Sequence, residues 1–322
     1  MTAQPGTRVL KADRDAIAAA ARCLAEGGLV AFPTETVYGL GADASHGETV
    51  ARLYAAKGRP AFNPLIAHVA DIDAARGVGV FTLATEKLAA AFWPGPLTLV
   101  LAKQPDCGVA DLALAGLDTV AVRVPAHPVA HALLEAFHGP IVAPSANRSG
   151  HVSPTSATHV LADLRGRIDL VIDAGPCEVG VESTIVSCTD EPTLLRPGGI
   201  AREAIEHALG TTLATAAPTD EAPLAPGMLT SHYAPKATLR LDADAAQPGE
   251  ALLAFGHAPS FPGTTFNLSP RGDLIEAAAN LFSHLRALDA SGAQRIAVMK
   301  VPHDGLGEAI NDRLKRAAAP KR

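Results

Sequence analysis

Polar residues that suit a small charged ligand stand directly after apolar segments of this chain. Residues 33–39, PTETVYG, follow the apolar run 28–32. Open α/β sheets bind ligands at the carboxyl ends of their strands, and threonine hydroxyls both donate and accept hydrogen bonds. The segment therefore suits a small zwitterion. The competing interpretation is a turn rich in serine and threonine.

Two cations stand two residues apart in the next polar segment. Lys57 and Arg59 belong to the sequence KGRPAFNPL at 57–65, between a predicted helix and an apolar strand. Lysine supplies a point charge and arginine a fork for two oxygens, a combination that suits a polyphosphate. A solvated cationic loop is the alternative.

A strand-like run at 119–124 contains a third cation. Thr119 and Arg123 are four residues apart, so their side chains point to the same face of a strand. Among Val and Ala neighbours Arg123 needs a partner, either a bound carboxylate or an internal Asp or Glu. His68, in the apolar run 65–69, suits either a ligand site or a satisfied core position.

The segment 143–150, APSANRSG, follows another short strand. Ser145 and Asn147, with the amides of the loop, could line a phosphate or ribose pocket. Ser153 comes soon after, although the sequence SPT at 153–155 could also begin a helix. Further polar residues stand at strand ends at 182–184 and 196–199.

Other sequence motifs are weak. No phosphate-binding G-x-x-x-x-G-K-[ST] loop occurs, and GLGADA at 39–44 follows a segment that favours a turn more than a strand. We therefore expect its glycines to form a tight turn rather than a dinucleotide site. The four cysteines have no CxxC spacing and no histidine pair near them, which disfavours zinc and favours a reduced, cytoplasmic protein.

Alternating strands and helices must position these residues. We predict a mixed sheet, because several strands follow one another too closely for helical crossovers. The expected strands are 28–33, 65–69, 97–101, 119–124, 141–143, 170–172, 184–186 and 193–195, and the expected helices are 48–56, 83–92, 129–137 and 201–209.

The last third of the chain changes character at residue 211. Residues 211–237 contain four prolines and little periodicity, which predicts a linker, and SHYAP at its end is too specific for a spacer. Strands at 251–255 and 296–299 and helices at 275–285 and 309–317 then predict a small Rossmann-like unit. One face of the first of these helices is expected to consist of Ile275, Ala278, Phe282 and Leu285. The predicted domains are 10–210, the linker 211–237, and 238–322.

Composition narrows the class of function. The 322 residues carry a net charge of −6, all of it in residues 1–210, so the basic excess of a general nucleic-acid-binding protein is absent. The polar first residues predict no signal peptide, and no apolar run approaches the length of a membrane span.

Several motifs in order resemble the YrdC-like family. They are PTETVYGLG, KGRPxxNPL, TVAVRVP, APSANRSG, GVESTIV and LLRPGG, followed by PGMxxxHYAP and GLGEAINDRLKRAA. The two tail motifs are similar to the long, two-domain form of that family, the L-threonylcarbamoyladenylate synthases. The resemblance covers about residues 10–322.

The resemblance implies a fold and an activity. The fold is α/β, a twisted mixed sheet with a large cavity, plus a smaller Rossmann-like C-terminal domain whose linker crosses the mouth of the active site. The activity is that of a nucleotidyltransferase. It condenses L-threonine, bicarbonate and ATP to threonylcarbamoyl-AMP, releases pyrophosphate, and serves threonylcarbamoyladenosine modification of tRNA next to the anticodon. Mg²⁺ is expected to accompany ATP.

The resemblance also implies a role for each site residue. The threonine-binding set is Thr36, His68, Arg123, Ala143 and Ser183. The ATP-binding set is Arg59, Asn63, Thr119, Ser145, Ser153, Arg196 and Tyr233. The catalytic set is Lys57, Arg59, Ser145 and Asn147.

The expected partners are the three substrates and a downstream threonylcarbamoyl transferase complex. We expect a monomer in the cytoplasm that binds neither a membrane nor nucleic acid stably. Three rival functions compare poorly. An RNA-binding module would need more basic charge than this chain carries. A carbamoyl-transferring hydrogenase-maturation protein would contain CxxC pairs, which are absent from the sequence. The only sequence evidence for an NAD-dependent dehydrogenase is the short motif GLG at 39–41.

Overall fold

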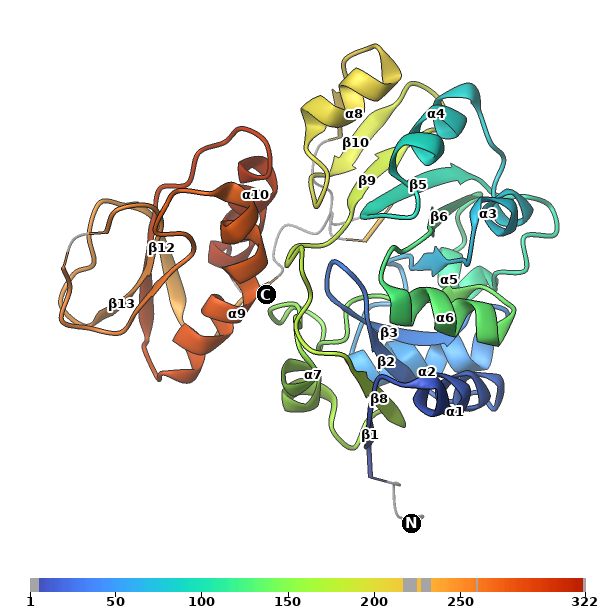
Figure 1. Cartoon of the computed structure of the whole chain (residues 1–322), viewed down its shortest axis with the longest axis horizontal. Coiled ribbons are helices and arrows are strands. Elements are labelled where there is room, and N and C mark those ends of the chain that lie inside the picture. The colour runs from blue at the N-terminus through green and yellow to red at the C-terminus, as the bar shows by residue number, and fades with distance from the viewer. Residues whose placement is uncertain (1–5, 217–224, 227–232, 259, 321–322) are drawn as a thin grey trace.

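The chain forms two units, each built on its own sheet (Figure 1). The computed structural model describes residues 6–216, 225–226, 233–258 and 260–320. The larger unit contains an eleven-stranded mixed sheet and the smaller a four-stranded parallel sheet. The predicted α/β class with a mixed sheet is confirmed.

The strands of the large sheet follow the order β1-β8-β2-β3-β7-β4-β6-β5-β9-β10-β11. Parallel and antiparallel neighbours alternate irregularly; β4 and β6 are parallel, for example, and β5 and β6 antiparallel. The strands are β1 (Arg8–Lys11), β2 (Val30–Pro33), β3 (Tyr38–Asp43), β4 (Ile66–His68), β5 (Leu97–Ala102), β6 (Thr119–Arg123), β7 (Ile141–Val142), β8 (Leu170–Asp173), β9 (Thr184–Ser187), β10 (Thr193–Arg196) and β11 (Ala214–Thr215).

In the described part of the larger unit, eight helices pack around this sheet. Short polar residues begin several of them; Asp13, Asp71 and Thr82 each accept a hydrogen bond from a backbone amide of the first turn. The helices are α1 (Arg14–Ala25), α2 (Gly47–Lys57), α3 (Ile72–Val78), α4 (Leu83–Phe92), α5 (Asp111–Leu114), α6 (Pro128–Phe137), α7 (Ala157–Leu164) and α8 (Arg202–Leu209). Those predicted at 48–56, 83–92, 129–137 and 201–209 are confirmed to within two residues.

The two faces of the large sheet differ in what covers them. Leu99 and Val122 belong to one extensive apolar core with residues of α2, α3, α4, α7 and α8. On the opposite face α1 and α6 pack over β2, β7 and β8. Farther along that face Ala225 covers a small apolar cluster that includes Val100 and Ala121. Because side chains alternate along a strand, His68, Thr98 and Arg123 share this second face.

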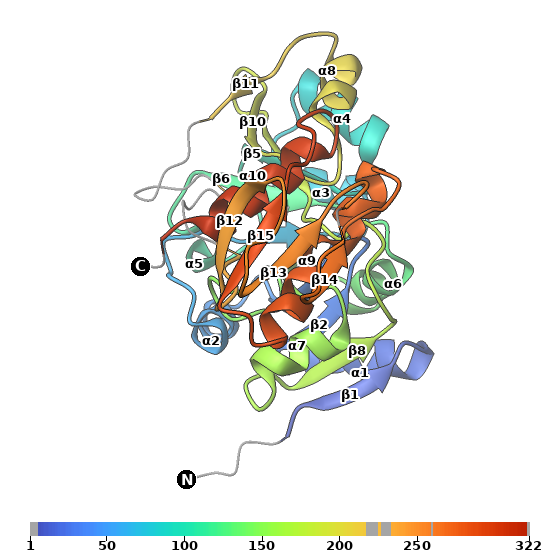
Figure 2. The ribbon, with the colours of Figure 1, turned by 90° about the vertical axis from the view of Figure 1, so that its left-hand side faces the viewer.

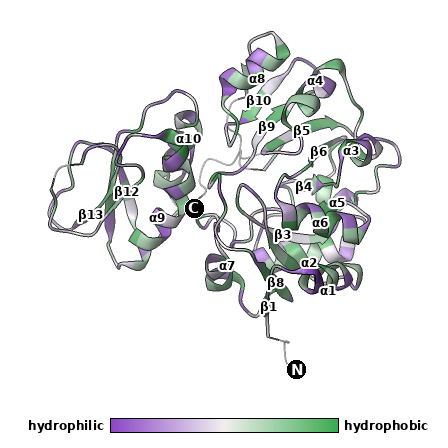
Figure 3. Ribbon diagram, viewed as in Figure 1, coloured by the Kyte–Doolittle hydropathy of each residue, from purple (hydrophilic) through white to green (hydrophobic). Residues whose placement is uncertain are grey.

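The smaller unit has the predicted Rossmann-like order. Its strands are β12 (Thr238–Ala243), β13 (Glu250–Ala254), β14 (Thr265–Asn267) and β15 (Arg295–Met299), and its helices are α9 (Leu274–Ala290) and α10 (Gly307–Ala318). The sheet order β12-β15-β13-β14 is parallel throughout. Figure 2 shows α9 and α10 in relation to this sheet, and Figure 3 shows that both helices contain hydrophilic and hydrophobic residues.

Three local predictions are wrong. Gly39 and Gly41 lie within strand β3, not in a tight turn, and they permit close packing: a Cβ at Gly41 would lie 2.8 Å from the ring of Phe32. Lys57, which the sequence places between the predicted helix 48–56 and the next strand, is the last residue of helix α2. Ile275 is 70% exposed because it follows the N-cap of α9 and points away from the core.

The two units meet through α9 and α10. Val37, Val152 and Val181 of the larger unit are part of the apolar core of the smaller one. At Gly180, a Cβ would lie 2.4 Å from backbone atoms of Ala278 and Ala279 in α9. Only glycine allows the chain to approach that helix so closely.

Candidate active site

The predicted site residues gather on the second face of the large sheet and around its margin. Most are almost completely buried, Lys57, His68, Arg123, Ser153 and Arg196 among them. Charged groups that are removed from water in this way need specific partners. Those partners define what the site can bind.

Arg123, at the end of β6, is held from three sides. Its Nη2 donates to Glu35 (2.6 Å), its Nη1 to the Thr36 hydroxyl (3.0 Å), and its Nε to the carbonyl of Gly95 (3.2 Å). The internal carboxylate considered from the sequence is therefore present. A guanidinium has five N–H groups, so two remain for a ligand.

Glu35 is a partner that the sequence did not single out. Burial alone would raise its pKa, but attraction and hydrogen bonding from Arg123 outweigh burial and lower it. The carboxylate is therefore ionised. Its second oxygen is buried without a hydrogen-bond partner among the described residues.

Thr36 lies in a turn closed by Thr34. The Thr34 hydroxyl donates to the carbonyl of Val37 (2.7 Å) and contacts the Thr36 hydroxyl (2.7 Å). Because Thr34 has used its proton, Thr36 donates to Thr34 and accepts from Arg123. The turn and the binding interpretation of this segment therefore coexist: the turn orients the hydroxyl beside Arg123.

His68 and Ala143 line the same region of the sheet. Burial first, and the Arg123 charge second, lower the pKa of His68 to about 3, so its ring is neutral. Its Nδ1 donates to the carbonyl of Ile66 (3.2 Å), as expected of a satisfied core histidine. Ala143 is buried against Gly39, where a Cβ would lie 3.2 Å from that of Ala143.

Lys57 ties helix α2 to the segment APSANRSG. Its ammonium donates to the backbone carbonyls of Ser145 and Asn147. Burial first, and repulsion from Arg59 second, lower its pKa well below the usual value. The amide of Asn147 donates to the carbonyls of Arg148 and His151, which fixes its orientation and leaves its Oδ1 buried and unpaired within the described residues.

Arg59 and Asn63 form a second part of this wall. Arg59 donates to the carbonyls of Asn63 (3.3 Å) and Pro64 (2.9 Å). Burial lowers its pKa to about 10, and the phenol oxygens of Tyr54 and Tyr233 partly oppose that shift. The side-chain oxygen of Asn63 is also buried and unpaired within the described part of the chain.

Arg196, at the end of β10, is bound to the segment that precedes β9. It donates to the carbonyl and hydroxyl of Ser183 and to the carbonyl of Pro226 (3.2 Å). Ser183 also contacts the hydroxyl of Thr98 at 2.7 Å. Pro226 places one described residue of the linker directly above this strand end.

Ser153 is held by residues that sequence reasoning missed. Its hydroxyl lies 2.5 Å from Oε1 of Glu182, and Oε2 of Glu182 accepts from Nε of Arg313 in α10 (2.8 Å). Burial would raise the pKa of Glu182, but Arg313 and Arg196 lower it to about 2. The motifs GVESTIV and GLGEAINDRLKRAA contain the two partners, but nothing in the sequence predicts that they meet.

Tyr233 lies between the two units. Its ring stacks on Phe282 of α9 with centroids 5.4 Å apart, and the guanidinium carbon of Arg313 lies 5.2 Å from the ring centroid. The phenol group of Tyr233 raises the pKa of both Arg59 and Arg196 by electrostatic attraction, so it lies near these two cations. His232 and most of the linker before it lie outside the described residues.

Two predicted residues have fewer contacts. Thr119 begins β6, at the opposite end from Arg123, and its hydroxyl has no hydrogen bond within the described ranges. Ser145 pairs through its backbone with Gly39 and accepts from Lys57 through its carbonyl. The structure therefore spreads the predicted threonine and ATP residues along the sheet face instead of gathering them at one point.

Three buried cations give the site its charge. In the described part of the chain, Lys57, Arg59 and Arg196 hydrogen-bond only to neutral oxygens, and none of them forms an ion pair. Of the four buried side-chain atoms without a partner there, three belong to Glu35, Asn63 and Asn147. The buried cations indicate that an anionic ligand completes the site, and the unpaired oxygens, which only accept hydrogen bonds, indicate that the bound molecules also carry donor groups.

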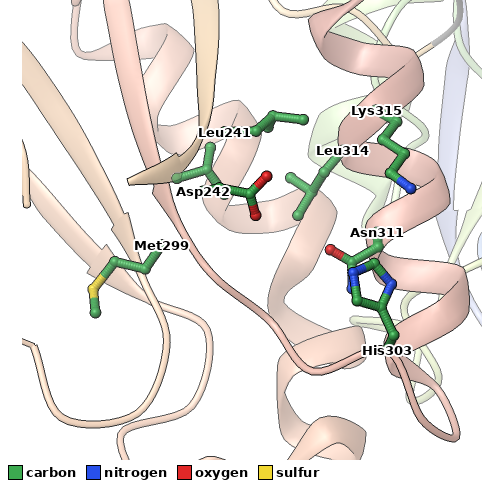
Figure 4. A pocket seen from close by; sticks show the side chains of 8 residues that line it. Leu241, Asp242, Met299, His303, Asn311, Leu314 and Lys315 are labelled. Carbon is green, nitrogen blue, oxygen red and sulfur yellow. The ribbon is translucent and has the colours of Figure 1, made fainter. Parts of the chain in front are cut away.

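Two other cavities lie outside this site and contain none of the catalytic or binding residues predicted from the sequence. A cavity of about 30 Å³ in the smaller unit is lined by Asp242, His303, Asn311 and Lys315, and Figure 4 shows these side chains. It has room for about one water. A groove of about 500 Å³ runs between α8 and α10, and two ion pairs line it, Arg202 with Glu308 and Arg316 with Asp312.

The described residues contain no group of three or more His, Cys, Asp or Glu side chains placed to hold a metal ion. Within the same residues, no helix is long and apolar enough to cross a membrane. All four cysteines are free thiols.

Comparison with known proteins extends these observations. A family model described as "Telomere recombination" matches residues 22–198, and one described as "Threonylcarbamoyl-AMP synthase, C-terminal domain" matches residues 200–319. A threonylcarbamoyl-AMP synthase of Bacillus subtilis is 43% identical, with 94% of this chain and 92% of that protein covered. One of Pyrococcus abyssi is also 43% identical, with 93% of each covered.

A solved structure is similar over almost the whole chain. It is the crystal structure of P. abyssi Sua5 complexed with L-threonine, at 40% identity and a TM-score of 0.88, with 97% of this chain and 96% of that chain covered. Both units are therefore shared with that protein.

Proposed function

The chain belongs to the family of threonylcarbamoyl-AMP synthases, and from this premise we propose how its buried site carries out the reaction. The chain is a nucleotidyltransferase that condenses L-threonine, bicarbonate and ATP to threonylcarbamoyl-AMP and pyrophosphate, for threonylcarbamoyladenosine modification of tRNA. The roles of individual residues are our proposal.

One observation carries the assignment of the ATP site. Lys57, Arg59 and Arg196 are buried cations that form no ion pair among the described residues, although the carboxylate of Glu182 lies near enough to Arg196 for each charge to shift the pKa of the other. Burying charge in this way is costly unless a ligand of opposite charge binds. A polyphosphate would neutralise all three, and no other substrate of the reaction carries enough negative charge.

We assign the threonine carboxylate to Arg123. Two N–H groups of its guanidinium remain after Glu35, Thr36 and Gly95 have been satisfied. They suit a carboxylate, while the ionised Glu35 and its unpaired oxygen suit the threonine ammonium. His68, Ala143 and Ser183 are proposed to complete this end, with Ala143 acting through its backbone.

The chemistry then needs alignment and charge neutralisation. Once deprotonated, the amine of threonine condenses with bicarbonate, and water is lost as the carbamate forms. A carbamate oxygen attacks the α-phosphorus of ATP, and the bond to the β-phosphate oxygen breaks to release pyrophosphate. No covalent enzyme intermediate is required, so Lys57, Arg59 and Arg196 serve by holding the phosphates and stabilising charge.

The remaining ATP contacts follow the family pattern. Asn63, Thr119, Ser145, Ser153 and Tyr233 are proposed to bind the nucleotide. Asn147 is proposed to shape the segment that carries Ser145, because its amide donors are held by the carbonyls of Arg148 and His151 and its remaining oxygen is an acceptor that does not bind phosphate. We propose that Mg²⁺ enters as the substrate complex with ATP. A cytoplasmic monomer that passes its product to a transferase complex, without binding tRNA stably, remains part of the proposal. The four free thiols are in keeping with a reducing compartment.

A conservative change at Arg123 tests the division of the site. In Arg123→Lys the charge beside Glu35 remains but the fork is lost. We expect the KM for threonine to rise by roughly 10-fold to 100-fold while the KM for ATP changes less than about twofold. Steady-state pyrophosphate release with each substrate varied gives both constants.

Arg52→Lys is the matched control, because Arg52 is half-exposed and bonds to Gly27 and Asp169 outside the site. An Arg123→Lys enzyme with an unchanged KM for threonine, or with both constants raised equally, would remove Arg123 from the threonine site.

A further inference from the structure

The smaller unit forms hydrogen bonds with one short segment of the larger unit, residues 152–153. Arg286 of α9 donates to the carbonyls of Val152 and Ser153 and to Asp163 (2.8 Å). Arg313 of α10 reaches the side chain of Ser153 indirectly, through Glu182. Figure 1 shows α9 and α10 on the side of the smaller unit that faces the larger one.

Arg313 is the more deeply placed of the two. Its side chain is fully buried, and its donors are divided among Glu182 (2.8 Å), the carbonyl of Pro197 (3.0 Å) and Asp312 (2.6 Å). It also packs against the face of the Tyr233 ring. One side chain of the C-terminal unit therefore contacts Tyr233 directly and Ser153 through Glu182, and both are proposed ATP ligands.

The network fixes the direction of the Ser153 hydroxyl. Glu182 is ionised because the Arg313 charge lowers its pKa, and a carboxylate only accepts hydrogen bonds. The hydroxyl proton of Ser153 must therefore point to Glu182, and its oxygen keeps its lone pairs. In the described chain no donor is bound to that oxygen.

We propose that Arg313 is a positioning residue for the nucleotide: through Glu182 it fixes Ser153 as a hydrogen-bond acceptor for a donor group on the nucleoside. This inference rests on the proposed assignment of Ser153 to the ATP site. The phosphates carry only acceptor oxygens at neutral pH, so Ser153 does not bind them. The donors of ATP are the adenine 6-amino group and the two ribose hydroxyls, and the acceptor faces one of these.

The first test measures binding, so it does not depend on turnover. Arg313→Met keeps the bulk of the side chain but removes its donors, and calorimetric titration of the full-length protein gives the Kd for ATP and for L-threonine. We expect the Kd for ATP to rise about 10-fold, because Ser153 is no longer held as an acceptor, and the Kd for threonine to change less than about twofold. Arg313→Lys should lie between Arg313→Met and the wild type.

The matched control is Arg202→Gln, which removes another ion pair between the units, with Glu308 on the same helix α10. It lies away from Ser153 and Glu182, and we expect wild-type affinity for both ligands. If Arg313→Met resembles Arg202→Gln, or weakens both ligands equally, the positioning role is wrong. If the wild-type protein shows no threonine-dependent release of pyrophosphate, the proposed function itself is wrong.

A second test covers the case in which Arg313→Met does not fold. Wild type and Ser153→Ala are titrated with ATP and with analogues that lack the 6-amino group, the 2′-hydroxyl or the 3′-hydroxyl. We expect Ser153→Ala to weaken ATP and two analogues, and to have no further effect on the analogue that lacks the partner of Ser153. An equal penalty with ATP and all three analogues would overturn the acceptor assignment.

Discussion

The charge state and the hydrogen-bond partners of each residue in this site follow from its burial. Arg123 is balanced by Glu35, whereas Lys57 and Arg59 are satisfied only by carbonyls within the described chain. That difference separates a zwitterion site, which needs both signs of charge, from a polyphosphate site, which needs only cations. The same surroundings lower the pKa of His68 and keep its ring neutral.

The neutral state of His68 predicts a pH dependence of stability. The unfolded chain binds a proton at this histidine near its usual pKa of 6.5, but the folded protein does so only near 3. The unfolded state therefore binds more protons between these values, and stability falls as the pH falls from about 6.5 to about 3. From about pH 7 to about pH 5, His68 should cost about 2 kcal/mol of the free energy of unfolding.

Urea denaturation of wild type and His68→Asn over that pH interval measures this contribution. We expect the wild type to lose about 2 kcal/mol more than the variant as the pH falls, because an asparagine side chain does not titrate. His257→Asn, at an exposed position, should follow the wild type. Parallel losses in wild type and His68→Asn would show that the buried ring is not the cause.

At the scale of elements, one glycine sets how closely the two units approach. Gly175 and Gly180 both have a positive φ, so alanine at either position carries a similar backbone strain. Only Gly180 of the two faces helix α9, where a Cβ would lie 2.4 Å from backbone atoms; at Gly175 the space is open.

Gly180→Ala should therefore destabilise the protein by at least about 2 kcal/mol more than Gly175→Ala, and should weaken ATP binding as α9 and α10 move from Ser153. Thermal unfolding and ATP titration of the two variants measure both effects. Equal melting temperatures and equal ATP affinities in the two variants would show that close approach at α9 is unimportant.

Elements with strong apolar patterns could be predicted from the sequence, and others could not. The runs 97–101 and 119–124 correspond to β5 and β6, because only a strand buries such short apolar segments from both faces. Strand β3 differs from the prediction because its glycines suggest a turn; their role is close packing against Phe32 and Ala143. Periodicity does not report such tertiary contacts.

At the scale of the whole molecule, the site depends on contacts between distant parts of the chain. The family resemblance supplied Ser153, Arg196 and Tyr233 as ATP residues, but not the supports Glu182 and Arg313, which are 131 residues apart. A charged residue in a sequence motif does not reveal its partner; only the fold brings the two together. Residues 1–210, which carry the net negative charge of the chain, contain the buried cations Lys57, Arg59 and Arg196.

The central claim is that one chain joins threonine, bicarbonate and ATP at this buried site. The most direct measurement follows ¹⁴C from labelled bicarbonate with the full-length protein, ATP, Mg²⁺ and L-threonine. We predict that label appears in a compound that also contains threonine and AMP, with one pyrophosphate released for each molecule formed. Pyrophosphate release without threonine, or a product that contains AMP but no label from bicarbonate, would contradict the account.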